Sequence, residues 1–139
     1  MTKKVFADSD VILDILCKRE PHYEYAAQVF SLADTRQLRL YTTSLVVVNV
    51  YYILRKVIGI EKAKEALRKL RLLMHIIAIE EQEIDLALNS PFSDFEDALQ
   101  YYTAVRHHMD MLLTRNIKAY KEKALIIQTP EQFIKTLCR

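Results

Sequence analysis

Short apolar runs alternate along the chain with longer segments in which apolar residues recur every three or four positions. Short continuous runs are typical of strands buried on both faces, and the longer period is typical of amphipathic helices. The runs that predict strands are 4–8, 38–42, 75–79, 111–114 and 124–127. The segments that predict helices are 11–16, 23–33, 44–56, 61–73, 80–88, 95–105 and a last one from Pro130 onward. Strands alternating with helices indicate an α/β fold, in which helices cover both faces of a parallel sheet.

The segment 44–56 fits two patterns. Its valines and tyrosines favour a strand, yet the segment is longer than a typical strand. Ser44 is suited to cap a helix, and Gly59, the only glycine of the chain, is suited to end one. We therefore predict a buried helix. Farther along, Ser93 and Glu96 have the spacing of a capping box and predict the start of another helix.

Composition narrows the class of protein. The 139 residues are 51% hydrophobic with one glycine and three prolines, which excludes a disordered chain and disfavours an all-β fold. This length is that of one domain, so we expect a single domain over residues 1–139. The net charge of +2 is too small to make the whole protein a nucleic-acid binder by charge alone.

The sequence also indicates a compartment. The longest apolar stretch, 45–54, contains Asn49 and is far shorter than the roughly 20 residues that a membrane span requires. Cys17 and Cys138 lie at opposite ends of the chain and lack the spacing of a metal site, as expected of ordinary thiols in a reducing environment. We expect a cytoplasmic protein with no membrane partner.

Five aspartates in two short clusters carry the candidate chemistry. Asp8, Asp10 and Asp14 follow the first predicted strand, and Asp94 and Asp97 open the predicted helix 95–105. Because strand ends and helix starts meet at one edge of a parallel sheet, carboxylates from both clusters can gather around a hard cation such as Mg²⁺. Simpler interpretations exist. Asp8 or Asp10 can cap a helix, Asp94 and Glu96 fit the first turn of a helix, where negative charge is favoured, and Asp14 can be a solvated or locally paired helix residue.

Four motifs occur in an order and spacing that identify a family. They are the segment 5–14 (VFADSDVILD), Thr43-Ser44-Leu45, the segment 94–99 (DFEDAL) and the segment 112–116 (LLTRN). In this arrangement the chain resembles the PIN-domain proteins over essentially its whole length. The best-known members of that family are the VapC-like toxin ribonucleases of toxin–antitoxin pairs.

The resemblance implies a three-layer α/β/α fold around a five-stranded parallel sheet, and cleavage of RNA by water activated by Mg²⁺ or Mn²⁺. It places two of the family's metal-binding acids on Asp8 and Asp97, with Asp94 as an accessory acid. The two other acidic positions fall on Asn49 and Asn116, which are neutral amides. Losing two carboxylates weakens cation binding, so we expect weak or absent activity, with Asp8, Asp97 and Asn116 as the catalytic residues. A second metal ion is not expected.

Other residues have supporting roles in this prediction. Asp10, Ser44 and Thr114 are accessory residues, and Arg115 and Lys118 are expected to contact substrate phosphates. The resemblance also implies RNA and an antitoxin protein as partners. We further expect a homodimer through the apolar helix face around residues 51–54.

Alternative functions remain open. A PIN-like fold can be a non-catalytic module that binds RNA or protein, and a metal-dependent hydrolysis assay separates that function from a nuclease. The sequence around Asp8, Asp10 and Thr114 is also similar to that of haloacid-dehalogenase-type phosphatases. In those enzymes the metal-binding acid pair follows the Thr and a Lys, whereas Asp94 and Asp97 precede Thr114 here.

The basic face of the segment 61–73 has two interpretations as well. Its lysines and arginines can contact nucleic-acid phosphates, because such contacts need no specific sequence. It can also be a solvated helix face on which Glu65 pairs with Arg68 or Lys69.

Overall fold

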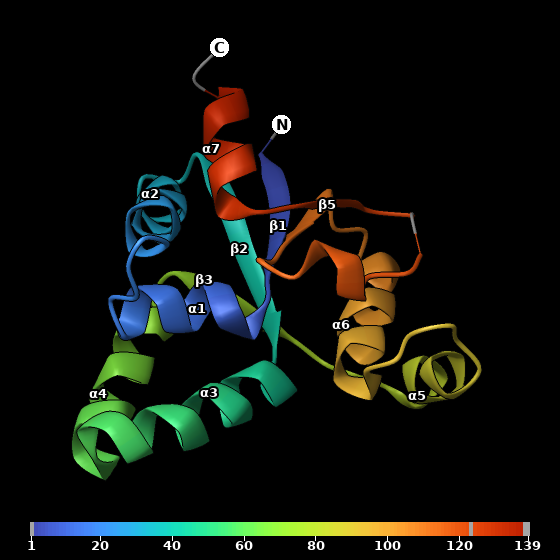
Figure 1. Cartoon of the computed structure of the whole chain (residues 1–139), viewed down its shortest axis with the longest axis horizontal. Coiled ribbons are helices and arrows are strands. Elements are labelled where there is room, and N and C mark those ends of the chain that lie inside the picture. Colours follow the sequence, from blue (N-terminus) through green and yellow to red (C-terminus); the bar gives the residue numbers. More distant parts are fainter. Residues whose placement is uncertain (1, 123, 138–139) are drawn as a thin grey trace.

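A computed structural model describes residues 2–122 and 124–137 of the chain (Figure 1). Cys138 therefore lies outside the described residues. The elements are β1 (Lys3–Ala7), α1 (Ser9–Leu16), α2 (Tyr23–Asp34), β2 (Leu38–Thr43), α3 (Ser44–Ile58), α4 (Ile60–Arg71), β3 (Met74–Ile77), α5 (Glu81–Leu88), α6 (Phe95–Arg106), β4 (Met111–Leu113), the 3₁₀ helix η1 (Ile117–Ala119), β5 (Ile126–Gln128) and α7 (Pro130–Leu137). The ambiguous segment 44–56 is a helix, as predicted.

One parallel sheet of five strands organises the molecule, in the order β3-β2-β1-β4-β5. The chain builds outward from β1 through β2 to β3 and then returns to place β4 on the other side of β1. The order therefore reverses between β1 and β4. In open parallel sheets, ligands bind beyond the carboxyl ends of the strands at such a reversal.

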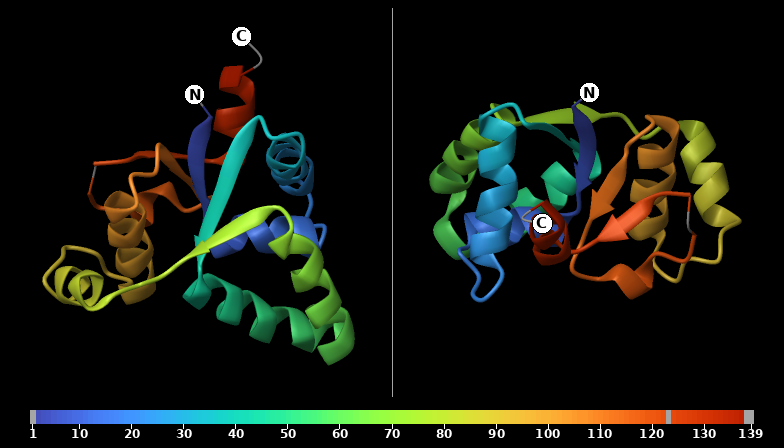
Figure 2. Two further views of the ribbon diagram at one scale, coloured as in Figure 1. Left: turned by 180° about the vertical axis from the view of Figure 1, so that it is seen from behind. Right: turned by 90° about the horizontal axis from the view of Figure 1, so that it is seen from above.

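Helices cover both faces of this sheet, which confirms the predicted three-layer α/β/α architecture (Figures 1 and 2). On one face, residues of α1, α2, α3, α4 and α7 pack with Val5 and Ala7 of β1. On the other face, Phe6 of β1 packs with α6 and with the segment that follows β4. Val5, Phe6 and Ala7 of β1 thus enter opposite layers in turn and are all fully buried, which is why this part of the strand is an apolar run without alternation.

Two strands differ from the sequence prediction by two residues at one end, and the other three differ by no more than one residue at either end. The predicted strand 75–79 forms as Met74–Ile77, because its partner β2 turns into α3 after Thr43 and leaves later residues nothing to pair with. The predicted strand 124–127 forms as Ile126–Gln128. The backbone N–H of Ala124 instead donates to the Tyr101 hydroxyl on α6 at 2.6 Å, which draws this residue away from the sheet.

Helix starts also differ in detail. The cap of α3 is Thr43 rather than Ser44, since the Thr43 hydroxyl accepts from the backbone N–H of Val46. The predicted Ser93–Glu96 capping box is wrong: Asp94 caps α6 by accepting from the backbone N–H of Asp97. A cap at Asp94 puts Glu96 in the first turn, where its side chain is available for another contact. Gly59 does end α3, with φ of 86°.

Within the described part of the chain, no helix combines the length and the apolar character needed to cross a bilayer.

Candidate active site

Asp8 stands at the point where the strand order reverses. Its backbone N–H donates to the carbonyl of Leu113 at 3.0 Å, which ties the end of β1 to the end of β4. The side chain is 7% exposed and caps α1 by accepting from the backbone N–H of Ser9 at 2.7 Å. Its Oδ2 accepts from the Thr114 hydroxyl at 3.0 Å and from the Tyr120 hydroxyl at 2.8 Å. Three donors therefore fix the orientation of a buried carboxylate.

Tyr120 is a site residue that sequence reasoning missed. It lies just after η1 and is 2% exposed. Burial and the negative charge of Asp8 raise the pKa of its phenol, so the hydroxyl keeps its proton and acts as a donor. Asp8 is 112 positions away in the chain, and no local pattern in the sequence signals this pairing.

Asp10 belongs to the same cluster. Its Oδ2 accepts from the backbone N–H of Arg115 at 2.9 Å and from the Thr114 hydroxyl at 3.3 Å. Its Oδ1 is buried without a hydrogen-bond partner among the described residues. Burial and the nearby Asp8 raise the pKa of Asp10 to about 6. A buried carboxylate oxygen without a donor is costly, and a cation would satisfy it.

Asp97 joins the cluster from α6. Burial is the largest of the causes that raise the pKa of Asp97 to about 7. The negative charges of Asp8, Asp94, Asp10 and Glu96 are the further causes, in that order. The charges of Asp8 and Asp10 contribute to this shift, and convergence of the two acidic clusters on one cation stays a prediction. Asp94 is exposed and serves as the helix cap, one residue before the first turn in which it was expected. Negative charge gathered without a compensating cation is the electrostatic condition that a divalent metal relieves.

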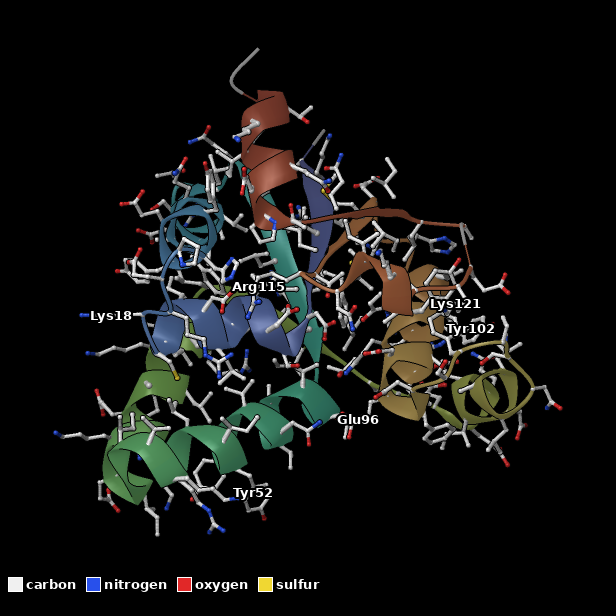
Figure 3. The ribbon with its side chains drawn as sticks, in the orientation of Figure 1. Lys18, Tyr52, Glu96, Tyr102, Arg115 and Lys121 are labelled. Atoms are coloured by element: carbon white, nitrogen blue, oxygen red, sulfur yellow. The ribbon has the colours of Figure 1, made fainter. Side chains whose placement is uncertain are left out.

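Glu96, expected from the sequence only as the partner of Ser93 in a capping box, makes a different contact. Its Oε2 accepts from the amide nitrogen of Asn49 on α3 at 2.8 Å. A buried bond lies beside this pair: the Thr43 hydroxyl donates to Oε1 of Gln100 at 2.7 Å. Figure 3 shows Glu96 between the beginnings of α3 and α6. The first turns of these two helices are therefore joined at the edge of the cluster.

Asp14 and Arg115 form a separate ion pair. Nε of Arg115 donates to Oδ2 of Asp14 at 2.7 Å and Nη2 donates to Oδ1 at 3.1 Å. Asp14 is fully buried, so its interpretation as a solvated or locally paired residue is wrong: its partner is 101 positions away. A carboxylate neutralised by a two-point guanidinium contact is a structural element of the core.

The other predicted site residues lie around this cluster. Asn116 is exposed, and its backbone N–H donates to the Thr114 hydroxyl at 3.1 Å. Lys118 is exposed on η1, two residues before Tyr120. Ser44 is exposed in the first turn of α3. Convergence of Asp8, Asp97 and Asn116 on a single cation stays a prediction, as do the roles of Ser44 and Lys118.

The donor set fits a divalent cation in chemistry, because it consists of carboxylate and amide oxygens. Among residues 2–122 and 124–137, no three His, Cys, Asp or Glu side chains are already grouped as a metal site. The carboxylates instead meet hydroxyl and backbone donors. A cation would therefore compete with protons on Asp97 and Asp10, whose raised pKa values keep a part of each protonated near neutral pH.

Comparison with known proteins identifies the family. The family model described as the PIN domain matches residues 4–118. The chain belongs to the PIN-domain family. A relative, Ribonuclease VapC1 from Aquifex aeolicus (strain VF5), is 29% identical over 137 residues, which are 95% of this chain and 94% of that protein. The four motifs noted in the sequence are thus those of a PIN domain.

Solved structures show the same fold. VapBC2 from Rickettsia felis, bound to a DNA fragment from its promoter, is similar with a TM-score of 0.69 and 18% identity, over 91% of this chain and 98% of that chain. VapBC-1 from nontypeable Haemophilus influenzae is similar with a TM-score of 0.68 and 15% identity, over 92% of this chain and 98% of that chain.

Proposed function

We propose that this PIN-domain protein is a divalent-metal-dependent ribonuclease of the VapC toxin type, with Mg²⁺ or Mn²⁺ held by Asp8 and Asp97. One observation carries the proposal: Asp8 lies at the reversal of strand order, and burial together with the charges of Asp8, Asp94 and Asp10 raises the pKa of Asp97 on α6 to about 7. The relationship to a ribonuclease supports the same conclusion. PIN-domain VapC ribonucleases generally depend on divalent metals.

The side chains have distinct tasks in this proposal. When bound, the divalent cation supplies a Lewis acid for the phosphodiester and lowers the pKa of a water molecule. Thr114 and Tyr120 hold Asp8 in one orientation, so this side chain would lose little conformational entropy on binding a cation. Asp97 and Asp10 lose their protons when a cation arrives. Asn116 offers an amide oxygen in place of a carboxylate, which lowers the expected affinity.

Two basic side chains are candidates for binding the phosphates of the substrate. Arg115 uses Nε and Nη2 to bind Asp14, so a phosphate contact falls to its remaining nitrogen, Nη1. Lys118 is exposed on η1, beside the loop that carries Thr114 and Tyr120. The basic face of α4 contributes less support, because Glu65 already pairs with Arg68 at 3.1 Å.

Protein partners form part of the proposal. The structural neighbours from Rickettsia felis and Haemophilus influenzae are VapBC proteins, and another similar structure is a toxin–antitoxin complex from Klebsiella pneumoniae. We therefore expect an antitoxin to bind this chain. A homodimer would use the outer face of α3, where Val48, Tyr52 and Val57 are 48%, 50% and 65% exposed. Figure 3 shows Tyr52 pointing away from the body of the protein.

The test is a cleavage assay. The purified protein is incubated with labelled tRNA and ribosomal RNA in the presence of Mn²⁺, Mg²⁺ or EDTA. We expect cleavage with either metal and none with EDTA. Asp97→Asn should cut at least about 100-fold more slowly, because it removes a proposed ligand of the cation that activates water. The control is Glu81→Gln, which removes one carboxylate from the first turn of the distant helix α5.

The possible results separate the candidate functions. Cleavage by Asp97→Asn at the wild-type rate would contradict the proposal and indicate a contaminating nuclease. Binding of Mn²⁺ and RNA without cleavage would favour the alternative, a non-catalytic binding module.

A further inference from the structure

A basic hollow lies toward the amino ends of β2 and β3, at the edge of the sheet opposite to Asp8. Its volume is about 610 Å³, and buried Leu40 and Met74 are among the residues that line it. Arg36 lines it from the turn between α2 and β2, Arg39 from β2, and Arg71 from the end of α4. Figure 1 shows β2 running from this edge of the sheet to the other edge, where α3 begins. Three guanidinium groups from three segments therefore surround one hollow.

These guanidinium groups lack acidic partners. Within residues 2–122 and 124–137, no carboxylate forms a salt bridge with Arg36, Arg39 or Arg71. Arg71 donates through Nη1 to the carbonyl of Met74 at 3.1 Å, which fixes it beside the hollow and leaves its charge uncompensated. Of the described residues that line the hollow, only Asp34 is acidic. Three like charges around one hollow repel each other, and a bound anion would relieve that repulsion.

The positive charge continues along the same edge of the sheet. A second hollow of about 550 Å³ shares Thr2 and Arg39 with the first and is also lined by Lys3 and Lys4 of β1. Nζ of Lys4 donates to a neutral backbone carbonyl, so its charge is not neutralised. Asp110 lines this hollow as well, and its Oδ2 accepts from the backbone N–H of Lys4 at 2.8 Å. Basic residues thus follow three neighbouring strands, β3, β2 and β1, across roughly 10 Å.

The chemistry of these side chains indicates the ligand. The planar guanidinium group presents a fork of N–H donors that matches two oxygens of a phosphate. A single phosphate ion would occupy only a part of an edge that spans three strands. A nucleic-acid strand carries one phosphate per nucleotide, spaced about 3.4 Å along the axis of a duplex, and can contact several basic side chains in turn. RNA is the substrate proposed above, so it brings such phosphates to this protein without a further partner.

We propose that the basic edge, defined as Lys3, Arg36, Arg39 and Arg71, binds backbone phosphates of the RNA substrate at a distance from the active site. This inference rests on the proposed function. The six residues of β2 separate the two edges of the sheet by about 20 Å. At about 3.4 Å per phosphate, an RNA that reaches both edges extends at least about six nucleotides beyond the cleaved bond. The protein therefore selects long or folded RNA over short oligonucleotides.

The first experiment measures RNA binding without cleavage. Full-length protein is titrated in EDTA into a labelled RNA of about 30 nucleotides, and fluorescence anisotropy is recorded at several salt concentrations. The double variant Arg36→Gln with Arg39→Gln should bind at least about 10-fold more weakly than wild type. The slope of log K against log salt concentration should fall by about 1.4, because each phosphate contact with a single strand contributes about 0.7. Arg39→Lys, which keeps the charge, should bind within about 3-fold of wild type.

The matched control removes the same charge elsewhere. Lys64 and Arg68 are exposed on α4 and line neither hollow. The double variant Lys64→Gln with Arg68→Gln should bind RNA within about 2-fold of wild type and keep its salt dependence. A loss equal to that of the Arg36 and Arg39 variant would overturn the inference, because it would show that net charge alone determines the affinity.

The second experiment varies the length of the RNA in the cleavage assay with Mn²⁺. On the long RNA, the Arg36→Gln and Arg39→Gln double variant should raise KM at least about 10-fold and leave kcat unchanged, because it removes contacts far from the chemistry. On an RNA of about four nucleotides, which is too short to reach the basic edge, KM and kcat should both equal those of wild type. An equal rise in KM for both lengths would contradict a distant contact.

Failure of the two proposals can be told apart. If wild type cleaves no RNA, the proposed function fails, whereas a 10-fold loss of RNA binding by the double variant still supports the basic edge. If wild type cleaves RNA and the double variant binds the long RNA equally well, the inference alone is wrong. ATP and poly-glutamate serve as other anionic probes in the same titration. A double variant that loses affinity for either of them but not for RNA would overturn the inference, since the edge would then bind a different anion.

Discussion

Two acidic regions of this protein use the same chemical group in opposite ways. Asp14 is fully buried, and the Arg115 guanidinium neutralises it through two hydrogen bonds. Asp97 is only partly buried and meets Asp8, Asp94, Asp10 and Glu96, all of them negative. The difference lies in the partner. A carboxylate that is paired with a cationic side chain stabilises the fold. A carboxylate surrounded by other carboxylates is repelled by them, and a bound cation can relieve that repulsion.

The largest effect is expected from breaking the ion pair between Asp14 and Arg115. Arg115→Ala would leave the Asp14 carboxylate buried without a partner, and such losses cost about 3 kcal/mol or more of unfolding free energy. Urea unfolding followed by circular dichroism measures this change. The control is Arg68→Ala, which removes an exposed partner of Glu65 and should change stability by less than about 0.5 kcal/mol. Equal stability of both variants would show that the Asp14 pair is not a core element.

A smaller effect is expected from adding a negative charge near the carboxylates around Asp97. Asn116→Asp should raise Mn²⁺ affinity about 10-fold, or ~1.4 kcal/mol, if this side chain reaches the cation. The same variant should lower the melting temperature of the metal-free protein, since it adds one more like charge. Calorimetric titration measures the first change and thermal unfolding in EDTA the second. Unchanged affinity would mean that position 116 does not face the metal.

The smallest effect concerns the stability of the metal-free protein. Folding raises the pKa of Asp97 from 3.8 to about 7, so its contribution to stability is greatest in acid and is lost as the pH rises through this range. At pH 8 Asp97→Asn removes the repulsion. Solvent screens a partly exposed group, so we expect a gain of only about 1 kcal/mol, or ~3 °C in melting temperature.

The gain from Asp97→Asn should shrink as the pH falls toward 4, where the wild-type carboxyl is also neutral. Thermal unfolding in EDTA across this pH range measures it. A variant that is less stable than wild type at pH 8 would show that Asp97 is a structural residue like Asp14.

The sequence predicted the fold closely, because the periodicity of apolar residues directly reflects burial. It misplaced β5, since the contact that displaces Ala124, with the Tyr101 hydroxyl, joins residues from different elements. It also assigned the cap of α6 to Ser93, although Asp94 is an equally good cap and lies one residue later. Local chemistry permits both caps, and tertiary packing selects one of them.

Only part of the site was predicted, because sequence patterns reveal local context and not long-range contacts. Asp8 and Asp97 could be found because each belongs to a motif with a recognisable local context. Tyr120 could not, because its contact is with Asp8, which lies 112 positions away. Arg115 was expected to contact phosphate, and no local pattern revealed that the buried Asp14 holds it. Long-range pairing is what the three-dimensional structure adds.

The central claim is that the charge gathered around Asp97 is the binding site of a divalent cation. The most direct test is Mn²⁺ calorimetry at pH 7 in two buffers with different ionisation enthalpies, which counts the protons released on binding. Since the pKa of Asp97 is about 7, we expect release of at least half a proton per Mn²⁺ from wild type. Asp97→Asn should neither bind Mn²⁺ nor release a proton. Binding with no proton release, or equal binding by Asp97→Asn, would contradict the account.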